Sequence, residues 1–168
     1  VMRADLERLV AGLEDDSAGS IYLRALLLFA WASAMRRSEI SNLRWRHLRW
    51  DEQGVAVQIV RSKGDQTGEG QEIPLLFASR PNLCPVLALQ RLRAKLRWLC
   101  DDDDGDRPVF PRLTKAGWVR VSKPCPDRVL LERVRDAAKK AGIEPSSFGM
   151  HSFRSGFARC STKRRRAT

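Results

Sequence analysis

The sequence predicts one α+β domain that is mostly α-helical and carries a small antiparallel β-sheet. Two observations lead to this fold class. Apolar residues recur at helical spacing before residue 45 and after residue 85, whereas part of the stretch between them alternates with a period of two. Helices that come before and after a run of strands are typical of the α+β class. With 168 residues, the chain is long enough for one domain with a sizeable core.

The first part of the chain contains the most clearly helical segments. Residues 3–14 place their apolar side chains at helical spacing and predict a surface helix. Residues 23–35 are apolar nearly all round, which is typical of a helix that is buried on most sides. We expect this helix to continue without a break into residues 36–45, because Ile40 and Leu43 extend its apolar stripe.

The sheet is expected in the middle of the chain. Residues 55–60 alternate and are rich in β-branched side chains, which predicts a strand. A polar, glycine-rich turn over 62–70 leads to a second short strand at 71–75, where Pro74 marks the strand end or an edge position. Residues 48–51 are expected to add a third strand.

The second half of the chain returns to helical periodicity. Residues 85–96 predict an amphipathic helix with its leucines facing inward and with Arg91, Arg93 and Lys95 facing outward. The acidic run at 101–106 is expected to be a solvated surface loop.

Residues 108–111 are also expected to be irregular. The next helix is predicted at 127–141, with Asp127 as its cap and Gly142 as its stop.

The composition indicates a polyanionic partner. Lys and Arg number 31 against 20 Asp and Glu, which gives a formal charge of +11 and a pI of about 10.4. Such an excess favours nucleic acid above all, with an acidic membrane surface or a generally basic proteome as alternatives. The basic residues 161–168 are expected to form a disordered tail that adds non-specific affinity for phosphates.

The cysteines and the apolar runs bear on the compartment. The four cysteines are scattered, without metal-site spacing or a disulfide framework, so a reducing cytoplasm fits best; they are Cys84, Cys100, Cys125 and Cys160. The longest apolar run, residues 25–32, is too short to span a bilayer, and we expect no membrane partner.

Three polar groupings carry the chemical interest. His151 and Arg154 are spaced i,i+3 and share one helix face, as do Arg36 and Glu39, and Lys63 lies at the mouth of the predicted turn. Two guanidinium forks can hold the equatorial oxygens of a phosphoryl-transfer transition state without a metal ion. A lysine can protonate the leaving oxygen, and a histidine can handle the proton of the nucleophile. The alternative is an ordinary helix-surface pair with a turn lysine.

These groupings carry a resemblance to one family. Residues 36–45 (RRSEISNLRW) resemble the first arginine box of tyrosine recombinases, the phage integrase family. Residues 62–64 (SKG) and 72–75 (EIPL) resemble the lysine-bearing β-hairpin of the family and its following strand. Residues 151–158 (HSFRSGFA) are similar to its H-x-x-R box. The boxes occur in the family order and together span nearly the whole chain.

The resemblance implies a catalytic domain that breaks and rejoins double-stranded DNA through a covalent 3′-phosphotyrosyl intermediate, with neither a metal nor a cofactor. It implies that Arg36 and Arg154 hold the scissile phosphate. Lys63 would be the general acid toward the leaving oxygen, His151 the acid/base group and Glu39 the supporting carboxylate. Other recombinase protomers are the further partners it implies.

The chain departs from the family pattern in its nucleophile. No tyrosine follows Arg154, and the one tyrosine, Tyr22, precedes Arg36 on the expected continuous helix, where about 1.5 Å of rise per residue separates the two by roughly 20 Å. We therefore expect an integrase-like domain over residues 1–160 that lacks the last helices of the fold and the nucleophile. Smaller departures are Ala34, where a glycine is common, and His47, where an acid is common.

The function predicted from the sequence is that of a DNA-binding catalytic-domain fragment of a site-specific tyrosine recombinase that does not cleave DNA alone. Two alternatives stay open within the family: a tyrosine donated by a partner protomer, and a non-catalytic DNA-binding or regulatory module. A basic protein–protein module unrelated to DNA is a further alternative. The expected location is the cytoplasm, at the nucleoid in a bacterial host.

Overall fold

The structure is a computed structural model of the chain, and it describes residues 3–13, 16–59, 71–100, 105–113 and 119–147. The helices are α1 (Arg3–Ala11), α2 (Ala18–Ser33), α3 (Arg37–Ser41), α4 (Pro85–Cys100) and α5 (Asp127–Lys140). The strands are β1 (Leu48–Trp50), β2 (Gly54–Ile59), β3 (Gln71–Leu76), β4 (Pro111–Leu113) and β5 (Val119–Pro124). This order confirms the mostly helical α+β class.

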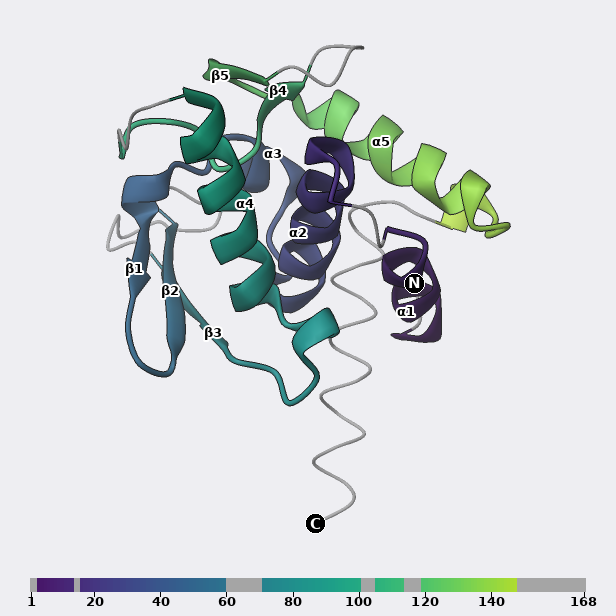
Figure 1. Cartoon of the computed structure of the whole chain (residues 1–168), viewed down its shortest axis with the longest axis horizontal. Helices are drawn as coiled ribbons and strands as arrows, with labels where there is room; N and C mark the ends of the chain where they lie inside the picture. The colour runs from purple at the N-terminus through teal and green to yellow at the C-terminus, as the bar shows by residue number, and fades with distance from the viewer. Residues whose placement is uncertain (1–2, 14–15, 60–70, 101–104, 114–118, 148–168) are drawn as a thin grey trace.

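Helix α2 lies at the centre of the molecule (Figure 1). It packs against α4 on one side and contacts α1 and α5, while the sheet of β1, β2 and β3 lies beyond α4 in this view. Its apolar side chains are buried almost all round, as the sequence predicts, and include Ala25, Leu26, Leu27 and Phe29. Removal of this much apolar surface from water is the main force that holds the helices together.

The prediction of one continuous helix from residue 23 to 45 is wrong. Helix α2 ends at Ser33, Ala34 adopts the left-handed conformation (φ 51°, ψ 23°), and Arg36 is extended before α3 begins. The apolar stripe hides this break, because Ile40 in α3 packs into the same core as α2. A periodic pattern reports which side chains are buried and does not report whether the backbone between them stays helical.

The three-stranded sheet forms as predicted. Strand β2 pairs antiparallel with β1 on one side and with β3 on the other. Pro74 lies in β3 opposite Ala56, and β3 is an edge strand of this sheet, where a proline is tolerated because one side of the strand needs no donor. The large hydrophobic side chains that the described residues leave exposed are Leu76 and Phe77, at the end of this edge strand.

A second, two-stranded sheet was missed. Pro111, which we expected to be irregular, begins β4, and β4 pairs antiparallel with β5. Strand β4 is only three residues long, and its register shifts between Pro111 and Arg112. A strand of three residues cannot show a period of two, but β5 has six residues, and its first four (VRVS) do alternate. That alternation was the signal for this sheet in the sequence.

Helix α4 buries Leu89, Leu92 and Leu96, as predicted. The expected outward position of Arg93 is wrong: its side chain is half-buried, and its guanidinium lies over the Trp45 ring with 5.7 Å from Cζ to the ring centroid. Because an arginine has a long apolar stem and a flat cation, it can cover an aromatic ring and still count as polar in a sequence pattern.

Helix α5 ends at the predicted stop. Gly142 has a positive φ of 67°, its N–H donates to Lys139 O, and the N–H of Ile143 donates to Ala138 O, which is the hydrogen-bond pattern of a Schellman cap. At the other end, Pro126 takes the cap position that the sequence predicts for Asp127. None of the helices in the described ranges is long and apolar enough to cross a membrane.

Candidate functional site

Arg36 occupies the junction between α2 and α3. The Glu39 carboxylate accepts two hydrogen bonds from this residue: Oε2 from the backbone N–H at 2.6 Å and Oε1 from Nη1 at 2.9 Å. The Glu39 side chain is 11% exposed and that of Arg36 is 44% exposed. One largely buried carboxylate thus satisfies a free N–H at the start of α3 and also sets the direction of the guanidinium.

The described residues leave most of the donors on this guanidinium available. Within the described part of the chain, Glu39 is its only partner, and Nη1 makes that contact. An arginine carries five N–H donors in a planar fork, so Nη2 and Nε of Arg36 can meet an oxyanion while Nη1 stays paired. At 44% exposure the ion pair adds little stability, and its main effect is to orient the side chain.

Helix α3 is held in place by contacts with the residues that lead into α5. Arg37 Nε pairs with Asp127 Oδ2 at 2.8 Å, and the buried Ser41 hydroxyl donates to Cys125 O at 2.7 Å. Since a helix of five residues is too short to be stable alone, these contacts and the burial of Ile40 fix its position. The site arginine therefore starts from a rigid element.

A hollow of about 260 Å³ adjoins Glu39, between α3 and β2. Its lining comes from both elements and from the residues between them: Met35, Ser38, Glu39, Asn42, Leu43, His47, Gln58 and Ile59. Ile59 is the last residue of β2, so the chain that leads on to Lys63 departs from the wall of this hollow.

His47 lies in the same wall. Its Nδ1 accepts the backbone N–H of Arg44 at 3.2 Å. Burial, and then the charges of Arg46 and Arg44, lower the pKa of the imidazole below its ordinary value, which favours the neutral form of the ring. An acid at this position could accept the same N–H, which explains in physical terms why a histidine can replace it.

The structure brings two of the predicted site residues together, Arg36 and Glu39. The other three, Lys63, His151 and Arg154, lie outside the described residues, as does the predicted tail at 161–168. Sequence reasoning missed the two anchors of α3, the Asp127 carboxylate and the Ser41 hydroxyl. Both residues contact partners that are far away in the sequence, and contacts of this kind leave no local periodicity or motif that could predict them.

Tyr22 belongs to the core. It is 1% exposed, and its ring packs edge-to-face on Phe110 with 5.7 Å between centroids. Burial, and then the neighbouring Cys125 thiol, raise the pKa of the phenol well above its ordinary value. A buried phenol that resists ionisation is a packing residue, so the prediction that Tyr22 is not a nucleophile rests on burial rather than on helix length.

Within the described residues, no three histidine, cysteine, aspartate or glutamate side chains come together as a metal site would require. The described thiols, Cys84 and Cys125, are free and buried.

A helical core that carries a three-stranded antiparallel sheet and presents an arginine at the head of a short helix is the architecture of a tyrosine recombinase catalytic domain. The chain belongs to the phage integrase family, whose model matches residues 1–160. Over 157 residues it is 31% identical to the integrase/recombinase xerD homolog of Selenomonas ruminantium, covering 92% of this chain and 42% of that relative.

Solved structures show the same fold at lower identity. The crystal structure of XerA recombinase matches with a TM-score of 0.68 and 20% identity, over 98% of this chain and 50% of that one. XerH recombinase bound to its difH substrate in a pre-cleavage complex matches with a TM-score of 0.69 and 17% identity, over 99% and 43%. The chain thus spans half or less of the length of these relatives.

Proposed function

We propose that the chain is the DNA-binding, phosphate-holding part of a site-specific tyrosine recombinase, and that Arg36 contacts the scissile phosphate. The observation that carries this proposal is the Arg36 guanidinium, which Glu39 orients through Oε1 while most of its donors remain available. A planar fork matches two phosphate oxygens, and donors that are already in place strengthen as negative charge builds in the transition state.

The remaining roles follow the family pattern. Arg154 would complete the clamp on the phosphate, Lys63 would protonate the leaving oxygen, and His151 would serve as the acid/base group. The hollow between α3 and β2 supports the role of Lys63, because the chain leaves β2 at Ile59 in the wall of that hollow.

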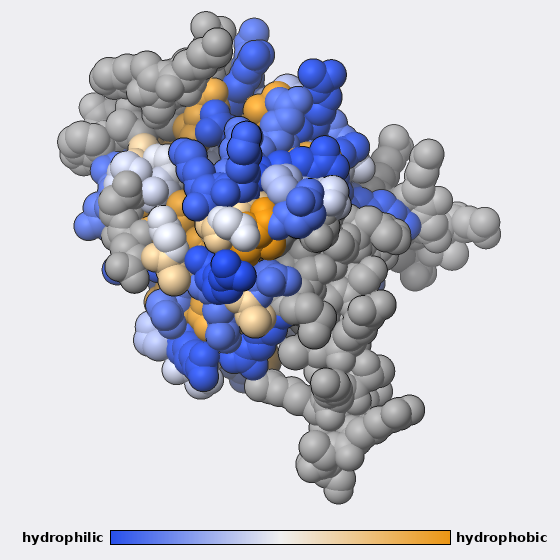
Figure 2. All heavy atoms as spheres, turned by 90° about the vertical axis from the view of Figure 1, so that its right-hand side faces the viewer, coloured by the Kyte–Doolittle hydropathy of each residue, from blue (hydrophilic) through white to orange (hydrophobic). Residues whose placement is uncertain are grey.

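Double-stranded DNA is the partner that the charge favours. The formal charge is +11, and on the side of α1 and α5 hydrophilic side chains cover most of the described surface (Figure 2). XerH was solved with its DNA substrate, and XerH shares this fold. A DNA partner would place the chain in the cytoplasm, at the nucleoid in a bacterial host.

The nucleophile would come from outside these 168 residues. Tyr22 is the one tyrosine of the sequence, and it is buried. We infer that the segment binds DNA without cleaving it, and that a tyrosine supplied by further sequence or by another protomer completes the site.

The experiment is an incubation of the purified chain with a nicked suicide duplex, run on paired native and denaturing gels. We expect a native shift that weakens with salt, by about 0.9 in log K per unit of log salt for each phosphate contacted, and no adduct that survives denaturation. An adduct that survives would show that one of these residues attacks phosphorus, contrary to the proposal. A flat salt response would contradict phosphate contacts.

Variants of Arg36 test its role directly. Arg36→Ala should weaken DNA binding about tenfold, because a hydrogen-bonded charge contributes that much. The DNA affinity of Arg36→Lys should lie between those of the wild type and Arg36→Ala. Arg3→Ala is the matched control, since it removes the same charge from an exposed residue that pairs with Glu7 on α1. Equal losses for Arg36→Ala and Arg3→Ala would show that only net charge matters, and would favour a non-catalytic DNA-binding module.

Donation of a tyrosine can be tested by complementation. The chain is mixed with an active relative whose first-box arginine is replaced by alanine, so that each partner lacks what the other supplies. Restored cleavage would support exchange between protomers. No cleavage over a range of mixing ratios would leave the nucleophile to the longer protein.

A further inference from the structure

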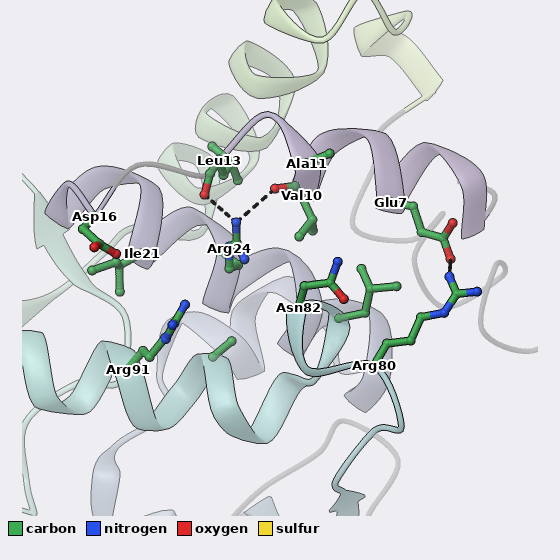
Figure 3. Close-up of a pocket in the computed structure, with 12 residues that line it drawn as sticks. Glu7, Val10, Ala11, Leu13, Asp16, Ile21, Arg24, Arg80, Asn82 and Arg91 are labelled. Carbon is green, nitrogen blue, oxygen red and sulfur yellow. Dashed lines mark hydrogen bonds and ion pairs between the residues drawn. The ribbon is translucent and has the colours of Figure 1, made fainter.

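A pocket of about 420 Å³ lies between α1, α2, α4 and the short turn at Pro81–Leu83 (Figure 3). None of the residues assigned to the phosphate site lines it. Its volume falls within the range of about 300–1,000 Å³ that is usual for ligand pockets. Its role is therefore separate from that of the proposed phosphate site.

Arginines approach this pocket from different elements. Arg24 comes from α2, and its Nη2 donates to Val10 O at 3.3 Å and Leu13 O at 2.6 Å. Arg24 thus caps the end of α1, and because these carbonyls carry no formal charge, the cation is not neutralised. Arg91 extends from α4 toward α2 and has neither an ion pair nor a hydrogen bond within the described residues (Figure 3).

The acidic residues of the pocket do not cancel these charges. Glu7 is already shared by Arg3 at 3.0 Å and Arg80 at 3.3 Å. Asp16 lies at the side of Ile21, and no ion pair joins it to Arg91. Among the described residues that line the pocket, Arg24 and Arg91 together outweigh the carboxylate of Asp16, so this lining favours an anionic group.

The rest of the lining narrows the class of anion. Ile21 and Leu83 are only partly buried and present apolar surface, next to the buried Val10 and Ala88. A duplex phosphate backbone carries no apolar group and would gain nothing from these apolar walls. A carboxylate carried next to an apolar side chain satisfies both features, because each part meets its complement.

We propose that this pocket binds an acidic segment of a protein partner. A glutamate or aspartate of the partner lies between Arg24 and Arg91, and the apolar side chain beside it packs on Ile21 and Leu83. This assignment is independent of the phosphate site and of DNA binding, and it adds a protein-recognition surface to the domain.

The test measures the binding of capped tetrapeptides to the whole chain, and two-dimensional NMR follows the binding. One peptide carries a glutamate beside a leucine, and matched peptides replace the glutamate by glutamine or by lysine. The glutamate peptide should shift signals of Arg24, Asn82 and Arg91 and bind at least about tenfold more tightly than the glutamine peptide. Equal binding of the two peptides would overturn the proposal.

Arg91 is the position to change, because it is exposed on a helix where alanine is well tolerated, whereas Arg24 caps α1. Arg91→Ala should weaken the glutamate peptide about tenfold, and Arg91→Glu should make the lysine peptide the preferred one. Arg128→Ala, which removes an equal charge from α5, should leave the affinity unchanged. The amide spectrum of each variant verifies the fold.

A titration with duplex DNA distinguishes an acidic protein segment from DNA as the partner that binds this pocket. If DNA shifts the same signals and displaces the peptide, the pocket is part of the DNA surface and the proposal fails. If DNA binds while the peptide signals stay unchanged, the protein-recognition role is supported, and the phosphate site can still be judged by its own Arg36 variants.

Discussion

Replacement of Glu39 tests the link between the fold and the phosphate site most directly. The carboxylate accepts the Arg36 backbone N–H at 2.6 Å and its Nη1 at 2.9 Å. Glu39→Ala removes both bonds, whereas Glu39→Gln keeps one acceptor oxygen and loses the charge. The two variants therefore separate the capping role from the ionic role.

The expected magnitude comes mainly from the cap. Loss of a side-chain cap on a helix start costs about 1 kcal/mol. The ion pair adds only a few tenths of a kcal/mol more, about 0.3, because Arg36 is 44% exposed and solvent screens it. Glu39→Ala should then lower the free energy of unfolding by about 1–1.5 kcal/mol, and Glu39→Gln by roughly half of that.

Urea unfolding followed by tryptophan fluorescence measures this difference, and the same proteins are titrated with duplex DNA. DNA affinity should fall for both variants, since neither holds the guanidinium by charge, and should fall further for Glu39→Ala. Unchanged stability in Glu39→Ala would refute the capping role. Unchanged affinity in both variants would show that Glu39 does not orient Arg36.

Three further substitutions test local features of the fold. Ala34→Gly should stabilise the protein by about 0.5 kcal/mol in thermal unfolding, since a left-handed alanine is strained (φ 51°), and a loss would contradict that conformation. Stability should fall as pH drops below about 6.5, because the neutral form of His47 is favoured in the folded state; His47→Asn should flatten this slope in urea titrations at pH 5.5–7.5. Gly54→Ala should cost about 2–3 kcal/mol or prevent folding, because a Cβ would lie 2.0 Å from Leu75 O, and a wild-type urea midpoint would refute this packing.

The sequence predicted the parts of the fold that rest on repeated patterns. Strand β2 buries Val55, Val57 and Ile59, the β-branched residues that identify it as a strand in the sequence, and it buries Ala56 between them as well. The end of α5 was predicted for a similar reason, because Gly142 is the residue type that a left-handed stop requires.

The parts that failed depend on contacts between distant segments. The break at Ala34 is stabilised by Glu39 and by the packing of α3, and neither shows in the local periodicity. Asp127 was interpreted as a local cap, whereas its carboxylate pairs with Arg37, far from it in sequence. From the sequence alone, a polar residue at a helix start can be either a local cap or the partner of a distant charge, and only the fold shows which one it is.

Two adjacent arginines show how this arrangement would prepare the proposed phosphate site. Arg37 is fixed by Asp127, and its pairing holds α3 against the start of α5. Arg36 is extended rather than helical, so its side chain leaves the same short helix in its own direction and is steadied by Glu39. Because Glu39 already restricts the Arg36 side chain in the folded protein, a phosphate that binds would order only the part of the guanidinium that Glu39 does not hold. The loss of conformational entropy on phosphate binding would therefore be small. The left-handed turn at Ala34 allows the two arginines to take these separate positions. In a continuous helix both would lie within one helix, and Arg36 would not be the cap residue of a new helix that begins at Arg37.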